Sequence, residues 1–483
     1  MIVELIFVFL IYLSGFIFVY SLGLRGFSIL AFGFIAGLAL QVSIGGLQLV
    51  IGLPTTPILT AFPMLLLPLF WLLYKRNPNS ISRNNLPRFF LFVTAVFVIT
   101  IISVVYFFGE GWAAFTFDSY RYLLASRLMY SGRFDILSED LLTKRMFGVP
   151  IIHMPAQMSG EFYLRSVFPL LGISTVAAVL WFIKKSLEDV LSKRVVWLMI
   201  AVAALLIISN NRFVWNMFYI NGHMLCAALA LIISALGWLI AQNKVNNPIR
   251  LFPLIIVSIP ALIFTRPESV IIAALAIVPM VASDRFSLRQ KQILLLTHGI
   301  ATTIFYGYVT WFLGVGIGRF HVLYLVFGIA VICLSGLFKY LLNLKIFVFV
   351  VKHASIIAEI TLWVALALLY LYNPAVLTIS IRAAYENLLL GEGAWGLSFV
   401  ILIAITFAIL FIIDLPKNMA ILRFPVTTFL PTMFLLAYLR GGAYRVGPGD
   451  SMNRMLVQIV PLVVLFIVMA ISFGKPRGYR EDE

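Results

Sequence analysis

The chain has 483 residues, of which 62% are hydrophobic and 11% are charged, with a formal net charge of +16 and a mean hydropathy of +1.06. This balance excludes a soluble globular protein of this length. It predicts an all-α, polytopic integral membrane protein with about 13 to 15 transmembrane helices. In such a protein, excess positive charge indicates orientation in the lipid bilayer before it indicates nucleic acid, which is not an expected partner.

Apolar runs long enough to cross a bilayer recur along the chain. The first run has no basic n-region and no small-residue cleavage site, and it contains Glu4, so we expect a retained span and not a signal peptide. Cys226 and Cys333 both lie in apolar runs, which argues against a disulfide framework. The fifteen expected spans are 2–22, 27–50, 56–74, 88–108, 166–183, 195–209, 213–240, 251–265, 267–282, 292–313, 319–338, 354–372, 397–413, 421–439 and 453–473.

The distribution of basic residues predicts the orientation. If the C-terminal tail is cytoplasmic, the short basic loops all alternate onto the same side, as the positive-inside rule requires. The longest loop, 109–165, then lies on the extracytoplasmic side of the cell (plasma) membrane, and long ordered loops are usually functional. The other outer segments mix acids, arginines and aromatic residues, so we expect any chemistry on that face; they are 209–212, 265–269, 318–321, 381–396 and 440–454.

The longest polar stretch of the chain begins this loop, with the sequence "TFDSYRYLLASRLMYSGRFD" (116–135). Its pattern predicts a short amphipathic helix on the outer interface, with Asp118 as the N-cap and Gly132 as the C-terminal stop. Ser119 and Ser126 are among the positions expected on the polar face. Residue chemistry alone leaves Asp118 open as a helix cap or a functional acid, and the arginines open as ligand contacts or as snorkelling side chains.

Four segments carry a resemblance to a known family. The segment "DSYRYLLASRLMYSGRF" resembles the acidic first-loop motif of the C superfamily of glycosyltransferases (GT-C), such as protein mannosyltransferases and lipid A aminoarabinose transferases. The segments "MPAQMSGEFYLRSVFPLLGISTVAAVLWFIKK" (154–185), "FTRPESVIIAALAIV" (264–278) and "GDSMNRMLVQIVPLVVLF" (449–466) are similar to later motifs of the same family, in the same order. Family members usually place the loop after their first span, so we expect 1–87 to be an N-terminal three-helix addition and 88–483 to be the GT-C-like core.

The resemblance implies an enzyme that moves a sugar from a polyprenyl-phosphate donor to a glycan, lipid or protein acceptor on the extracytoplasmic face, with inversion. By match, Asp118 is the general base, and a carboxylate suits the removal of a hydroxyl proton. The departing lipid phosphate needs cationic partners, for which the candidates are Arg266, Arg445 and Arg454. Two alternatives stay open: Arg266 can simply pair with Glu268, and Arg454 can snorkel to lipid headgroups.

Further candidates for substrate binding are Tyr120, Arg121, His153 and Glu268. His153 can position a substrate or only close the loop, and the second role is favoured.

A divalent cation, Mg or Mn, is not supported by an acidic pair, because Ser119 follows Asp118 where the family often has a second acid. Asp135, Glu139 and Asp140 could supply oxygen ligands together with Asp118. Their spacing matches no defined metal loop, so a solvated acidic turn is favoured.

Three other functions compete with this interpretation. An O-antigen polymerase or ligase also uses polyprenyl-linked donors, but its large outer loop normally comes late in the chain. A transporter or lipid flippase needs ionisable groups near the bilayer centre, where Glu359 and His298 are almost the only candidates. We expect Glu359 to bond a neighbouring helix instead. A non-catalytic assembly subunit is the third alternative.

Overall fold

The fold is that of an all-α membrane protein, as the sequence predicts. A computed structural model describes residues 2–53, 55–74, 95, 98, 116–133, 146–243, 248–312, 319–439 and 441–477. Within these ranges the only two strands, β1 (Ile413–Asp414) and β2 (Lys475–Pro476), form one short antiparallel pair near the C-terminus. The expected span 88–108 lies outside the described residues, apart from residues 95 and 98.

Eight of the described helices are long and apolar enough to cross a membrane. They are α1 (Ile2–Ser21), α2 (Phe27–Val50), α8 (Val167–Leu187), α11 (His223–Gln242), α14 (Leu288–Gly307, continued by a π-helical turn Tyr308–Phe312), α15 (Arg319–Leu341), α17 (Ala354–Tyr372) and α20 (Ala420–Leu439). Five further apolar helices are shorter: α3 (Pro57–Tyr74), α12 (Phe252–Ile263), α13 (Ser269–Ala282), α19 (Leu397–Ile412) and α22 (Val460–Phe473).

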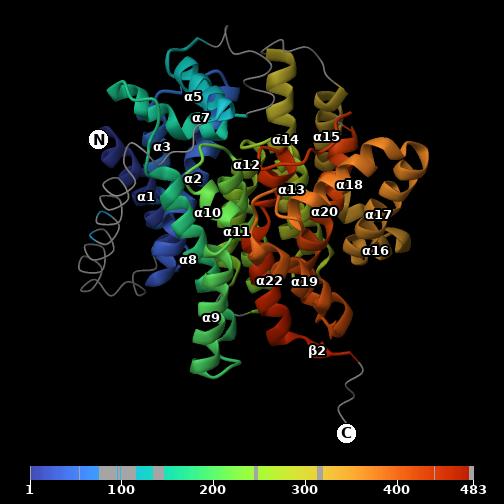
Figure 1. The fold of residues 1–483 in the computed structure, drawn as a ribbon. Helices are drawn as coiled ribbons and strands as arrows, with labels where there is room; N and C mark the ends of the chain where they lie inside the picture. The colour runs from blue at the N-terminus through green and yellow to red at the C-terminus, as the bar shows by residue number, and fades with distance from the viewer. Residues whose placement is uncertain are drawn as a thin grey trace.

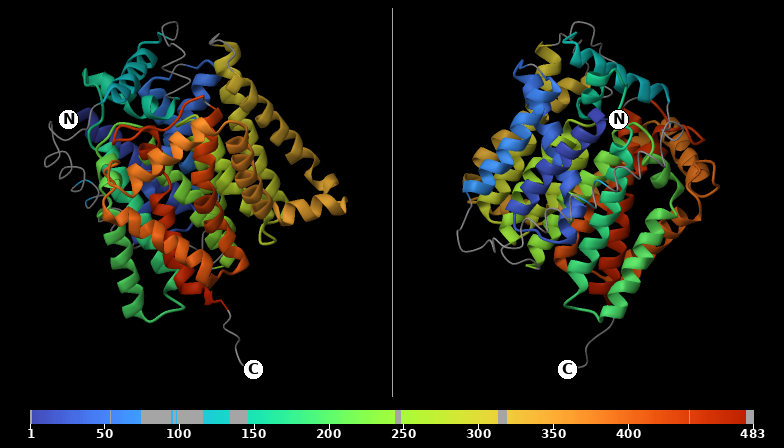
Figure 2. Two further views of the ribbon diagram at one scale, coloured as in Figure 1. Left: turned by 45° about the vertical axis from the view of Figure 1, so that its right-hand side comes forward. Right: turned by 90° about the vertical axis from the view of Figure 1, so that its left-hand side faces the viewer.

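The remaining helices are short or carry charges at an end. They are α5 (Phe117–Tyr130), α7 (Gly148–His153), α9 (Lys193–Ile208), α10 (Asn211–Asn216), α16 (Lys345–Lys352), α18 (Pro374–Leu388) and α21 (Ser451–Leu456), with 3₁₀ segments at Met154–Ser159, Pro248–Leu251 and Lys417–Met419. Helices α5 and α7 lie together at one end of the molecule, and β2 lies at the opposite end (Figures 1 and 2).

Helix α11 forms the centre of the bundle. All of its most apolar window is buried, and it contacts α8, α12, α13, α20 and α22 (Figure 1). The expected span 213–240 began too early, because α11 starts only at His223. Asn216, Asn221 and Gly222 favour turns, so the chain before α11 forms the separate helix α10 and a loop.

The N-terminal helices pack into the rest of the bundle. A Cβ atom added at Gly15 of α1 would lie 1.8 Å from the carbonyl oxygen of Gly33 in α2, so small residues allow these helices to touch. The Glu4 carboxylate accepts hydrogen bonds from the backbone nitrogen (2.7 Å) and hydroxyl (2.8 Å) of Ser166, just before α8. Helices α1 and α2 therefore brace α8, and the expected boundary at residue 87 falls outside the described ranges.

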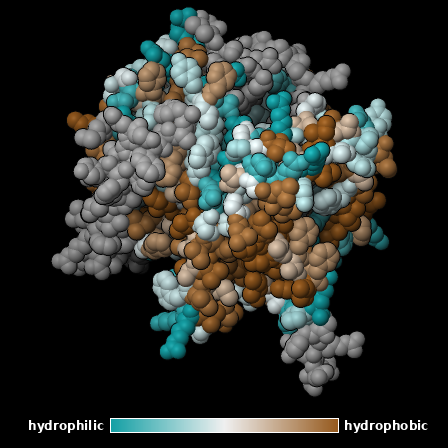
Figure 3. Space-filling view, in the orientation of Figure 1, coloured by the Kyte–Doolittle hydropathy of each residue, from teal (hydrophilic) through white to brown (hydrophobic). Residues whose placement is uncertain are grey.

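The outer surface requires an apolar environment. On the face shown in Figure 3, hydrophobic residues spread over the middle, and hydrophilic residues gather toward the upper part and the lower tips. Most apolar side chains of α15 and α17 are exposed, with Leu371 at 79%. Large exposed apolar areas of this kind mark contact with lipid or protein, which identifies a lipid bilayer as the surroundings of this bundle.

Both ionisable groups expected near the bilayer centre have partners. Glu359 of α17 accepts a hydrogen bond from Arg423 of α20 at 2.8 Å, which confirms that Glu359 bonds a neighbouring helix. His298 of α14 bonds the carbonyl oxygen of Val270 through Nε2 at 2.9 Å. These contacts join helices within the bundle.

Candidate functional site at the α5 end of the bundle

Helix α5 begins with Thr116, and not Asp118, as its N-cap. The backbone nitrogen of Thr116 donates to the Ser119 hydroxyl at 3.3 Å, an arrangement typical of a capping box. The expectation that Asp118 caps the helix was therefore wrong, and the carboxylate is available for other contacts in the first turn. Gly132 does end the helix, with a φ of +70° that favours glycine.

The buried face of α5 differs from the amphipathic face that the sequence predicted. Ser119 and Ser126 are fully buried together with Tyr122, whereas Tyr120 is 60% exposed. This face packs against α7 and the 3₁₀ segment after it. Small serine side chains allow such close packing, so the polar pattern of the sequence gave the wrong orientation.

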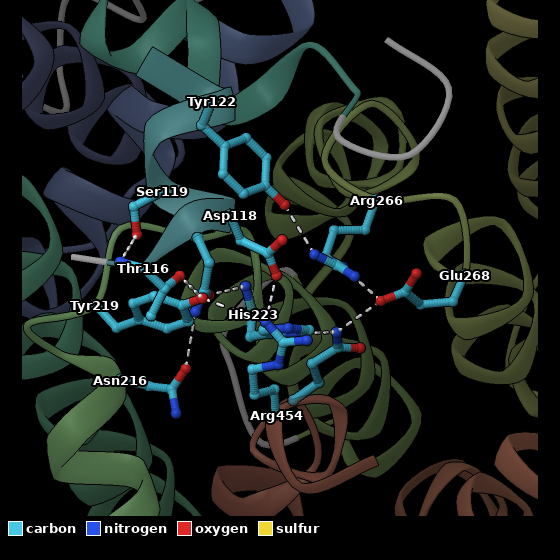
Figure 4. Close-up of polar contacts among 12 residues, drawn as sticks. Thr116, Asp118, Ser119, Tyr122, Asn216, Tyr219, His223, Arg266, Glu268 and Arg454 are labelled. Carbon is cyan, nitrogen blue, oxygen red and sulfur yellow. Dashed lines mark hydrogen bonds and ion pairs between the residues drawn. The ribbon is translucent and has the colours of Figure 1, made fainter. Parts of the chain in front are cut away.

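An ion pair connects α5 with α21. The Arg454 guanidinium of α21 donates through Nη1 to the Asp118 carboxylate (Figure 4). The same nitrogen lies 3.3 Å from the Tyr219 hydroxyl, which is 2.6 Å from the Thr116 hydroxyl. The two charged side chains are 22% and 24% exposed, so this pair stays accessible to a ligand.

A second ion pair lies deeper. Arg266 donates through Nε to Glu268 at 2.5 Å and through Nη1 to the Tyr122 hydroxyl at 2.8 Å (Figure 4). Gln458 also donates to Glu268, at 3.3 Å, and its side-chain nitrogen lies 2.7 Å from Nδ1 of His223. The Glu268 side chain is only 1% exposed, so this pair is built into the packing between α5, α13 and the start of α11.

The first ion pair lines a cavity of about 610 Å³. Two aromatic side chains, Trp215 and Tyr219, line it with their ring centroids 4.3 Å apart and their planes tilted by 37°. Two guanidinium groups and one carboxylate are among the described residues that line it. The lining consists of Thr116, Phe117, Asp118, Asn211, Arg212, Trp215, Tyr219, Ala394, Pro448, Gly449 and Arg454.

Arg212 is the second arginine of this cavity, and the sequence analysis did not select it. Its side chain donates through Nε to the Gly393 carbonyl and through Nη2 to the Pro448 carbonyl, each at 2.5 Å. The residue is only 5% exposed. Burial, and then the charge of Arg454, lower the pKa of Arg212 from its usual value. Arg212, Trp215 and Tyr219 precede α11, in the segment that hydropathy alone assigned mostly to a span.

Six predicted site residues, His153 among them, lie away from the cavity lining. Tyr120 points from the exposed side of α5, and the Arg121 guanidinium lies over the Phe117 ring at 4.3 Å. Arg445 is exposed, and its backbone nitrogen donates to Asp450 at 3.0 Å. Arg266 and Glu268 also lie outside the lining. Their predicted contacts with substrate stay predictions.

His153 is fully buried at the end of α7. Its Nδ1 atom accepts a hydrogen bond from the Leu164 backbone nitrogen at 3.1 Å, so the ring closes the loop between α7 and α8. Burial lowers the pKa of His153 to about 3. The imidazole is therefore neutral at neutral pH.

The predicted metal ligands are mostly outside the described ranges. This holds for Asp135, Glu139 and Asp140. Within the described part of the chain, no three His, Cys, Asp or Glu side chains lie close enough to hold a metal ion.

The comparisons with known proteins found no match. No protein-family model, no curated protein and no solved structure matches this chain. The class of the protein, a polytopic α-helical membrane protein, therefore rests on its own sequence and structure.

Proposed function

We propose that the chain is an inverting membrane glycosyltransferase. It takes a sugar from a polyprenyl-phosphate-linked donor and transfers it to a glycan, lipid or protein on the extracytoplasmic face of the cell membrane. The observation that carries the proposal is the Asp118 carboxylate on the wall of the 610 Å³ cavity. Asp118 is the only carboxylate among the described residues that line this cavity, which supports a single displacement with one base over a retaining mechanism that needs two carboxylates.

The proposed reaction uses this carboxylate as the base. The acceptor hydroxyl oxygen attacks the anomeric carbon, and the bond from this carbon to the phosphate oxygen breaks, with its electron pair remaining on the phosphate. The acceptor proton passes to Asp118. A guanidinium at the cavity wall, that of Arg454, stabilises the growing charge on the phosphate. The aromatic side chains of Trp215 and Tyr219 line the same cavity and offer apolar contacts to the sugar ring.

The second ion pair has a positioning role in this proposal. Arg266 binds both Glu268, two residues later in the chain, and Tyr122 of α5. It therefore holds the helix that carries Asp118 against the bundle. A contact between Arg266 and the donor phosphate would require this network to open.

The intramembrane contacts of Glu359 with Arg423 and of His298 with Val270 weigh against the transporter alternative. Ion-coupled transporters use ionisable groups to bind or relay their cargo. In this chain both groups instead join neighbouring helices.

The proposal is tested with the purified full chain and synthetic polyprenyl-phosphate sugars. We expect transfer by the natural chain and a loss of about 10²- to 10⁴-fold in rate for Asp118→Asn, the range for removal of a general base. The matched control is Asp414→Asn, which removes an exposed carboxylate from β1, and should keep full activity. If the natural chain transfers no sugar from any donor, or if Asp118→Asn is as active as the natural chain, the proposal is contradicted.

A further inference from the structure

Arg212 is a buried charge that the proposed reaction does not yet use. Its hydrogen bonds go to two backbone carbonyls, of Gly393 and Pro448, which come from segments far apart in the sequence. Its guanidinium carbon also lies over the Trp215 ring, 5.6 Å from the ring centroid. No described carboxylate forms an ion pair with it. Burial of a guanidinium without an opposite charge costs free energy. A ligand with negative charge would compensate the buried charge of Arg212.

The cavity has an excess of positive charge. Arg212 and Arg454 both line it, and Asp118 is the only carboxylate among its described lining residues. The charge of Arg454 contributes to the lowered pKa of Arg212, after burial itself. An anion that enters the cavity would therefore relieve the repulsion between the two guanidinium groups.

The two arginines differ in how firmly they are held. Carbonyl groups on two sides fix the Arg212 side chain, which is 5% exposed. The Arg454 side chain is 22% exposed, and its Nη1 nitrogen is shared between Asp118 and Tyr219. Its buried Nε nitrogen has no partner among the described residues. Arg454 can therefore exchange one partner for another, whereas Arg212 stays in place.

We propose that Arg212 and Arg454 together bind the phosphate ester of the ligand, and that this binding draws Arg454 away from Asp118. Arg212 is the fixed anchor and Arg454 is the group that exchanges. A phosphate offers three acceptor oxygens or two, according to its ester state, in a geometry that guanidinium groups match well, so it competes with the carboxylate for Arg454.

This inference rests on the proposed function and adds a mechanism by which the bound donor regulates the base. Without a phosphate in the cavity, Arg454 forms an ion pair with the Asp118 carboxylate, and Asp118 does not activate a nearby water. Once the phosphate is bound, the Asp118 carboxylate is released from Arg454 and can take the acceptor proton. The ion pair between Arg454 and the base is thus broken only when the donor is in place.

The test measures equilibrium binding of farnesyl phosphate to the full chain in detergent by isothermal titration calorimetry. Inorganic phosphate and uncharged farnesol are the comparison ligands. We expect Asp118→Asn to tighten farnesyl phosphate binding by about fivefold to tenfold, because it removes the competitor for Arg454, and farnesol to bind weakly to every variant. Simple loss of a negative charge would also tighten binding, so the same substitution is made in an Arg454→Gln background.

The double-mutant cycle separates these two causes. In the exchange mechanism, Asp118→Asn gives no gain in affinity once Arg454 is absent. An equal gain in both backgrounds would overturn the proposal. Binding that is tighter for farnesyl phosphate than for inorganic phosphate assigns the site to a lipid phosphate, and equal binding assigns it to a free phosphate.

The anchor is tested separately. Arg212→Gln should weaken farnesyl phosphate binding at least tenfold. Arg212→Lys keeps the charge, so its affinity for farnesyl phosphate should lie between that of the natural chain and that of Arg212→Gln. The control Arg382→Gln removes an exposed arginine from α18 and should bind as the natural chain does. Natural affinity in Arg212→Gln would overturn the role of Arg212. Binding of farnesyl phosphate needs no sugar transfer, so the two proposals can fail separately. If the chain shows the exchange of Arg454 but transfers no sugar, only the proposed glycosyltransferase function is contradicted. If it transfers sugar without the exchange, only this inference is contradicted.

Discussion

Two arginine–carboxylate pairs contact α5, and they differ mainly in their access to the cavity. Arg266 and Glu268 are 13% and 1% exposed, and Tyr122 completes their contacts. Arg454 and Asp118 are 22% and 24% exposed and line the cavity. The same pair of functional groups therefore serves packing in one place and is available to a ligand in the other.

The difference follows from the position of each pair in the chain. Arg266 and Glu268 lie two residues apart in one tight turn, so local sequence brings them together. Asp118 and Arg454 are 336 positions apart and meet only through the packing of α5 on the bundle. A pair assembled from distant elements can open without disrupting its own local structure, which suits a group that must change partners.

The largest expected effect comes from the buried pair. Glu268→Gln leaves the Arg266 charge buried without a carboxylate, and we expect a loss of about 3–5 kcal/mol in the free energy of unfolding. Thermal unfolding of the detergent-solubilised chain measures it. The control Glu386→Gln breaks the exposed pair with Arg382 and should change stability by less than about 1 kcal/mol. Equal effects of the two substitutions would remove the distinction between buried and accessible pairs.

A smaller effect is expected at the hydroxyl that completes the buried pair. Tyr122→Phe removes the acceptor for Nη1 of Arg266, and hydrogen bonds to charged groups contribute about 1.5–3 kcal/mol. The loss of stability should therefore be measurable but smaller than for Glu268→Gln. The same change at Tyr385, an exposed tyrosine of α18, serves as the control and should leave the free energy of unfolding unchanged. If Tyr122→Phe also leaves the free energy of unfolding unchanged, α5 is held in place without this contact.

The sequence predicts the helical class well. Hydropathy is a local property, and it locates most of the apolar helices. Of the arginines and acids that the sequence analysis selected, Asp118 and Arg454 line one cavity. The partners of these residues were harder to predict. The pairing of Asp118 with Arg454 depends on tertiary packing over 336 positions, and no local pattern contains it.

The segment before α11 shows a second limit of local patterns. Apolar residues after Arg212 made 213–240 resemble one continuous span, which hid Tyr219 and Trp215 from consideration as site residues. The signal against a continuous span was present in the turn-forming residues Asn221 and Gly222. These turn-forming residues place the start of the span near His223, where α11 begins.

The smallest expected change in stability belongs to the accessible pair. Asp118→Asn keeps the size of the side chain and an oxygen that can accept from Arg454, and partial exposure already weakens the attraction between the charges. We expect the free energy of unfolding to change by no more than about 1 kcal/mol. Thermal unfolding under the conditions used for Glu268→Gln checks this directly. A loss as large as that of Glu268→Gln would mean that Asp118 is needed for folding, and reduced activity of Asp118→Asn would then be no sign of a catalytic base. A small loss, combined with the expected fall in transfer rate, would separate the chemistry of the accessible pair from the packing role of the buried one.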